Sequence, residues 1–236
     1  DQLVLRAAAF EVVKRDLIVN QTIEPTQLAG FNQFFDDSNG TSSKNYGVGL
    51  DAHLIKNLFG GLELSRRDLE IPIGIGGLFE IEKDQEDSYS AYLYWLLDHN
   101  WSVTARYFYG EFEMQEGRYR RSALPTKIKT AIAPLNIRYF NPSGFFAGVG
   151  ATYVDQRVGF DPEATSTVSG SDDFFLFDTT VGYRLPKRWG VIALEVRNLT
   201  DQQFQFQDYS FQTANNSIDP LFLPERTWLA RVILNF

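Results

Sequence analysis

The last ten residues of the chain carry the feature that most restricts its fold, a strict alternation of side-chain character. Five apolar residues occupy every second position: Trp228, Ala230, Val232, Leu234 and Phe236. Since successive side chains of a β-strand point to opposite faces, the segment predicts a strand with one fully apolar face. That face would point into the core of a soluble sheet, but outward at lipid in a transmembrane barrel. The segment alone leaves both structures open.

The same alternation recurs along the 236-residue chain and predicts ten strands, or eleven or twelve if Gly30–Phe35 is a strand of its own. The connections alternate in length. Short ones are expected at 56–58, 98–100, 141–144 and 186–189, and long ones at 15–45, 70–87, 114–127, 160–172 and 199–224. Short periplasmic turns on one rim and long external loops on the other are typical of membrane barrels. Residues 71–87 are expected to be a loop, and Pro134 predicts a bulge in its strand.

The apolar face of the predicted strands carries almost no charge, and the charged residues gather on the other face. The charged set, as we call it, comprises Arg6, Asp51, His53, Glu63, Arg67, Arg106, Arg138, Asp178, Arg184, Glu195, Arg197 and Arg231. Burying these residues in a soluble core would cost several kcal/mol for each unpaired ion. Aromatic residues gather at the strand ends, as interfacial girdles do. We therefore expect an all-β, antiparallel up-and-down transmembrane β-barrel of about ten strands (10–12), as a single domain over residues 1–236, rather than a soluble sandwich or lipocalin-like barrel.

The charged set has two interpretations, both consistent with the sequence. Seven arginines face four carboxylates. In a barrel of about ten strands, side chains fill the interior, and these groups would form a salt-bridged plug without an open channel. In a larger barrel, the same excess of arginine would line an aqueous path and favour anionic solutes.

Composition argues against several other functions. A net charge of −8 argues against nucleic-acid binding, and the absence of cysteine excludes disulfides and thiolate metal sites. The two histidines, His53 and His99, have no serine or carboxylate at a catalytic spacing, and neither lies in a predicted external loop, where an outer-membrane hydrolase would need one. The acidic loop residues do not have the spacing of an EF-hand. We predict no enzyme activity, no metal and no cofactor.

Several short motifs carry a family resemblance. The alternation that ends in Phe236 resembles the assembly signal of Gram-negative outer-membrane barrels, which implies the barrel assembly machinery as a partner. Residues 196–201, followed by Phe204 and Phe206 and then by 223–227 (LPERT), resemble the last two strands of TonB-dependent receptors. Residues 5–8, 24–26 and 46–50 resemble the mid-barrel strand pair of those receptors and its loop.

The resemblance implies a bacterial outer-membrane location, contact with lipid and lipopolysaccharide, and passage of a solute. A full receptor is a plugged barrel of roughly 22 strands. This sequence shows no plug domain and no TonB-contact segment. We expect either the C-terminal part of a longer protein, with upstream domains or other envelope proteins as partners, or a small barrel related to that tail. Two alternatives remain: a non-transporting barrel that acts as a membrane anchor or structural module, and a soluble barrel that binds an apolar ligand.

Overall fold

Ten strands form one antiparallel sheet in which each strand pairs with the next along the chain. The computed structural model describes residues 3–14, 27–32, 38–75, 78–117, 124–161, 169–207, 222 and 225–235. The strands of the sheet are β1 (Leu3–Val13), β4 (Ser42–Ile55), β5 (Leu58–Ile75), β6 (Leu78–Leu96), β7 (Trp101–Glu116), β8 (Lys127–Phe140), β9 (Phe145–Gly159), β10 (Gly170–Arg184), β11 (Gly190–Arg197) and β12 (Thr227–Leu234). The predicted all-β, up-and-down meander of ten strands is confirmed.

Two short elements complete the described secondary structure. β2 (Gln27–Leu28) and β3 (Phe31–Asn32) form a separate two-stranded hairpin, so Phe31 and Asn32 do not extend the main sheet. The rest of the expected strand Gly30–Phe35, from residue 33 on, lies outside the described residues. A 3₁₀ turn, Pro186–Arg188, connects β10 to β11. No helix in the described part of the chain is long and apolar enough to span a membrane.

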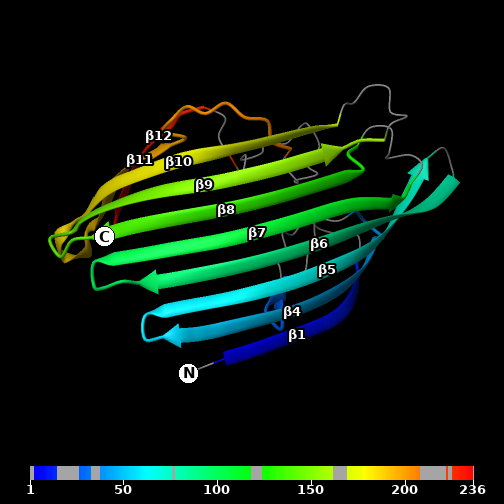
Figure 1. Ribbon diagram of the computed structural model, residues 1–236, viewed down its shortest axis with the longest axis horizontal. Coiled ribbons are helices and arrows are strands. Elements are labelled where there is room, and N and C mark those ends of the chain that lie inside the picture. Colours follow the sequence, from blue (N-terminus) through cyan, green and yellow to red (C-terminus); the bar gives the residue numbers. More distant parts are fainter. Residues whose placement is uncertain are drawn as a thin grey trace.

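The sheet is strongly curved, and its two edges are far apart in the sequence. The strands lie side by side in chain order, and the tight turns after β4, β6, β8 and β10 all lie at one end of the sheet (Figure 1). β1 and β12 form the edges, and the ladders between described strands include none that joins β1 to β12. The sheet is therefore open along these two strands.

Cross-strand register shows which side chains share a face. One row runs from Leu64 to Tyr89, Tyr109 and Ala131 on successive strands. It belongs to the convex face, whose apolar residues are open to the surroundings: Val149 is 57%, Trp228 62% and Val232 63% exposed. A band of large, exposed apolar side chains on one face is expected where a barrel contacts lipid.

The predicted loop at 71–87 is wrong, because β5 and β6 continue through it. Only residues 76 and 77, which are outside the described residues, separate the two strands. The acidic residues suit this ladder since they have partners in it. Arg67 Nη1 donates to Glu86 Oε2 at 2.6 Å, and Glu70 lies opposite Lys83.

The predicted bulge at Pro134 is also wrong. Pro134 lies opposite Thr152 of β9 in regular register. On the β7 side, the pairs Ala105–Leu135 and Phe108–Ile132 flank it without a register shift. The missing N–H of proline therefore interrupts the ladder locally without adding a residue to the strand.

Apart from Val196, the buried apolar residues of the main sheet lie on the concave face, mostly near the end with the long connections. One cluster contains Phe112, Met114 and Ile128. A second contains Val154, Phe174 and Leu176, and residues from the connection after β11 pack against it. The part of that connection at residues 198–207, here called the strap, follows the concave face because Gln205 N–H donates to Asp172 Oδ2 at 2.6 Å.

Candidate functional site: the charged concave face

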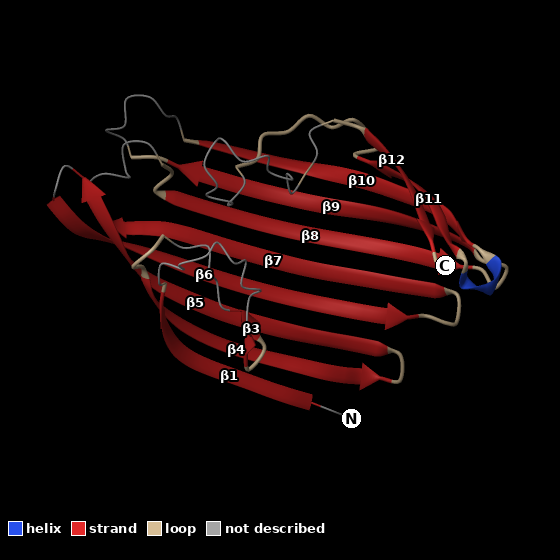
Figure 2. Ribbon diagram, turned by 180° about the vertical axis from the view of Figure 1, so that it is seen from behind, coloured by secondary structure: helices blue, strands red, loops and turns tan. Residues whose placement is uncertain are grey.

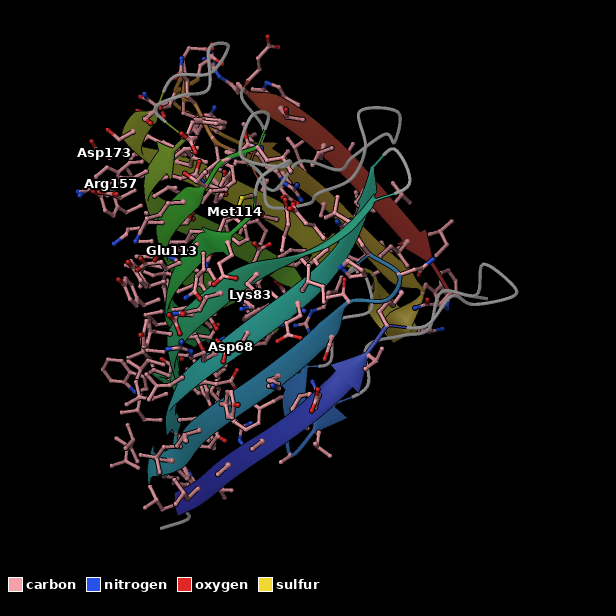
Figure 3. All side chains as sticks on the ribbon, turned by 90° about the vertical axis from the view of Figure 1, so that its right-hand side faces the viewer. Asp68, Lys83, Glu113, Met114, Arg157 and Asp173 are labelled. Carbon is pink, nitrogen blue, oxygen red and sulfur yellow. The ribbon has the colours of Figure 1, made fainter. Side chains whose placement is uncertain are left out.

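Strand register places the whole charged set on the concave face. Asp51 lies opposite Gly61, which lies opposite Tyr92, which in turn lies opposite Arg106. The other members follow from the two-residue period of their own strands. In Figure 3, Met114 and its neighbour Glu113 show the same alternation, since they leave β7 on opposite sides of the sheet.

An ionic network joins four strands at the β1 edge. Arg6 Nε donates to Asp51 Oδ2 at 2.8 Å, and Arg6 Nη2 donates to Glu63 Oε2 at 3.2 Å. Tyr92 donates its hydroxyl proton to the other Asp51 oxygen at 2.6 Å. Both oxygens of Asp51 are thereby paired, and one guanidinium bridges two carboxylates. The network ties β1, β4, β5 and β6 together by charge-assisted hydrogen bonds.

The β2–β3 hairpin covers this network from the concave side. The Phe31 side chain is buried, and the Arg6 guanidinium carbon lies 5.2 Å from its ring centre. Arg6 Nη1 also donates to the Ala29 carbonyl at 3.3 Å. Figure 2 shows β3 in front of the main sheet at β4 and β5. The Phe31 ring approaches the β4 backbone so closely that the residue beneath it must be glycine, since a Cβ on Gly47 would lie 2.5 Å from the ring.

Four other members of the charged set are held more locally. Arg67 pairs with Glu86, which sequence reasoning had placed in a loop. Glu195 and Arg197 pair with each other along β11 at 2.6 Å. Asp178 Oδ1 accepts the Asn198 backbone N–H at 2.9 Å and so fixes the start of the strap.

The remaining four arginines form no ion pair within the described residues: Arg106, Arg138, Arg184 and Arg231. Arg184 ends its strand at the short-turn end of the sheet, and Arg138 lies two residues before the end of β8 at the same side. Within the charged set, these four arginines and Asp178, which accepts only a backbone N–H, lie outside any ion pair of the described residues, so arginine predominates among the groups without an ion pair. The charged set does not form one continuous salt-bridged cluster in the part of the chain that the structure describes.

His53 lies near the tight-turn end, where its ring stacks on Phe59 with centroids 4.4 Å apart and planes inclined by 5°. Its buried Nε2 has no hydrogen-bond partner in the described residues. His99 lies in the turn between β6 and β7. The two histidines are on different segments, and the described residues contain no group of three His, Asp or Glu side chains able to hold a metal ion.

The predicted assembly signal occupies the edge strand. Trp228, Ala230, Val232 and Leu234 share the convex face of β12, and Phe236 lies outside the described residues. Trp228 lies opposite Val196 and Val232 opposite Ile192.

An aromatic cluster on the concave face was missed by sequence reasoning. Phe174 of β10 stacks on Phe204 of the strap, with centroids 4.4 Å apart, and meets Phe222 edge-on. Phe206 packs edge-on against Phe222 at 5.0 Å. The spacing of Phe204 and Phe206 by two residues is a strand-like signal for a shared face, but nothing in the sequence shows which face of the sheet they meet.

Comparison with known proteins gives one match. The sequence model of a protein family described as "TonB dependent receptor-like, beta-barrel" matches residues 1–199. That range contains every strand of the main sheet except β12. Nothing in the searches of curated proteins and of solved structures matches the chain.

Proposed function

The chain belongs to the TonB-dependent receptor-like β-barrel family, and on this premise we propose that it carries an anionic solute across the outer membrane of a Gram-negative bacterium. Membership supports an outer-membrane barrel of the transport or receptor type. The charge of the solute is our inference from the concave face. Nothing in the charged set supports a catalytic role, so we propose a protein without enzyme activity.

The open edges of the sheet bear on this proposal. Unpaired backbone N–H and C=O groups in a bilayer cost several kcal/mol each, so spanning sheets close on themselves. Since β1 and β12 do not pair with each other, we infer that further strands complete the barrel. A barrel of more than ten strands has room for a water-filled or plugged lumen.

The four unpaired arginines are the observation that carries the proposal. Arginine keeps its charge at any physiological pH and binds carboxylate or phosphate through two parallel hydrogen bonds. Rings and rows of Lys and Arg select anions in pores. Arg106, Arg138 and Arg184 come from three different strands and face the same space, so a passing anion would meet them in succession.

The second candidate, a closed barrel that anchors another domain, is favoured by a different observation. The β2–β3 hairpin and the strap both fold over the concave face and bury Phe31 and Phe174 there. If these segments stay in place, they narrow the interior. Such a barrel would hold its position in the membrane without passing a solute.

Measuring solute flux through the full-length protein in liposomes distinguishes an anion-conducting barrel from a closed membrane anchor. We expect entry of anionic solutes to exceed entry of cationic solutes of the same size, and the preference to fall when Arg106, Arg138, Arg184 and Arg231 are all changed to Gln. The matched control is Lys44→Gln with Lys129→Gln, which removes positive charge from the convex face. A barrel that remains closed at every applied voltage, with no upstream plug, would favour the anchor.

A further inference from the structure

A groove lies on the convex face along β8, outside the charged set. Its volume is about 400 Å³. The floor is made of small side chains, Ala131 and Ala133 of β8, and the flanking strands contribute tyrosines, Tyr107 and Tyr109 from β7 and Tyr153 from β9. Alanines between tyrosines leave a channel that runs parallel to the strand. Such a channel suits a linear apolar chain.

Two cations close the groove at one end. Lys129 and Arg157 lie directly opposite each other on β8 and β9, one step beyond the pair Ala131–Asp155. The Arg157 side chain is 71% exposed, and its contact with Asp155 is long at 3.6 Å. Lys129 shares Glu111 with Lys127, which lies closer to that carboxylate, at 2.9 Å against 3.2 Å. Both cations are therefore weakly held and open to a further anion.

The position of the groove indicates which leaflet it meets. Tyr89, Tyr109 and Ala131 mark one row across the sheet, and the convex face is apolar on the short-turn side of that row. On the other side come Glu113, Lys83 and Asp68, polar residues of the convex face (Figure 3). Long connections mark the external rim of such barrels, and aromatic rows mark the interface. The groove thus crosses the boundary between acyl chains and headgroups in the outer leaflet.

We propose that this groove binds lipopolysaccharide, with an acyl chain of its lipid moiety lying over Ala131 and Ala133 and a phosphate contacting Lys129 and Arg157. The proposal concerns the lipid-facing side, so it holds whether or not a solute crosses the interior. Asp155 and Asp173 lie opposite each other beside the cations, so the rim has mixed charge. Recognition therefore comes from direct contact with the two cations and from the fit of the chain, not from net charge.

The test uses the full-length protein in detergent micelles and native mass spectrometry with diphosphoryl lipid A. We expect saturable binding of one lipid that weakens by about thirtyfold in K129Q/R157Q, since each basic side chain near an anionic lipid surface contributes on the order of 1 kcal/mol. Ala133→Phe should abolish saturable binding by filling the groove while both cations remain. Asp155→Asn should tighten it by about threefold, because Arg157 loses its competing carboxylate.

The matched control is K44Q/R66Q. Arg66 occupies the register row that continues through Asp87 and Glu111 to Lys129, so it lies at the same height on the convex face but away from the groove. Its removal should leave lipid A binding unchanged. Arg157→Gln and Asp155→Asn alter only partly or fully exposed side chains, so they keep the test decisive if a double variant fails to fold.

Three results would overturn the proposal. Equal binding of lipid A stripped of its phosphates would remove the role of the cations. Unchanged binding in Ala133→Phe would show that the acyl chain lies elsewhere. Equal affinity for phosphatidylglycerol, or full displacement by inorganic phosphate, would show that the site does not select the glycolipid.

Discussion

Two parts of the concave face are stabilised in different ways. Near the β1 edge, Arg6, Asp51 and Glu63 form an ionic network with side chains that are still 23%, 29% and 35% exposed. Near β9 and β10, Val154 and Phe174 lie in an aromatic and aliphatic cluster at 0% and 3% exposure. Each part receives a segment folded inward from a long connection, the β2–β3 hairpin in one case and the strap in the other.

The difference shows what each inward segment depends on. The strap is fixed by ring packing, which is non-directional and grows with buried area. The β2–β3 hairpin is fixed by the Arg6 guanidinium, which also donates hydrogen bonds to two carboxylates. The position of the hairpin therefore depends on all members of the network being present. We therefore expect the aromatic side to resist changes in salt and pH and the ionic side to respond to them.

The largest effect is expected on the aromatic side. Phe174→Ala should lower the free energy of unfolding by about 3 kcal/mol, because it removes the ring that both Phe204 and Phe222 contact and leaves a cavity. Equilibrium urea unfolding in lipid vesicles measures the change. Phe175→Ala is the control, since the neighbouring ring lies on the convex face at 53% exposure and should cost on the order of 1 kcal/mol. Equal losses in the two variants would contradict a dry cluster under the strap.

An intermediate effect is expected in the ionic network. Arg6→Gln should cost about 2 kcal/mol, since it leaves two partly buried carboxylates without their cation. Adding Asp51→Asn to this variant should cost less than Asp51→Asn costs in the wild type. A double-mutant cycle that gives a coupling of about 1 kcal/mol supports the contact, and strict additivity would argue that the two groups do not interact. High salt should shrink the Arg6→Gln effect more than the Phe174→Ala effect.

The smallest effect concerns charges outside the membrane-spanning part. The Lys127 ammonium, which donates to Glu111, holds the pKa of that carboxyl below its ordinary value, and Lys129 and Tyr109 add to this. A carboxyl with a lowered pKa stabilises the fold fully above the pKa of the unfolded chain and loses this contribution as pH falls through the lowered value. Stability should therefore drop on acidification below about pH 4.5, the ordinary value, and Glu111→Gln should drop less. An equal pH dependence in both proteins would exclude Glu111 as a source.

Sequence alternation predicted the strands and their faces because the two-residue period acts locally. The alternation in their own strands was enough to assign Leu64 and Tyr89 to the apolar face and Arg6 and Asp51 to the charged face. In the structure these are the convex and the concave face. The extension of β5 and β6 through residues 70–87 was missed because acidic residues are depleted in strands. The cross-strand pair between Arg67 and Glu86 is visible only once the register is known.

The packing of the β2–β3 hairpin and the strap onto the concave face could not be predicted from the sequence pattern, for a related reason. Phe31 and Phe204 contact residues that are distant in the chain, Gly47 and Phe174 respectively. Whether a long connection extends into solvent or folds back depends on the space inside the curved sheet, which no single segment encodes. Likewise, Tyr92 shows its role only when Asp51 is placed two strands away.

The unpaired margins at β1 and β12 also have a practical consequence for anyone who produces residues 1–236 in isolation. Exposed strand margins recruit other chains through the hydrogen bonds they lack, which leads to aggregates and fibres. Trp228 and Leu5 would stabilise such a contact by burying apolar surface, because both side chains are more than 60% exposed. Refolding yields should therefore improve with additional strands on either flank, and crowded or concentrated preparations of this stretch alone should precipitate.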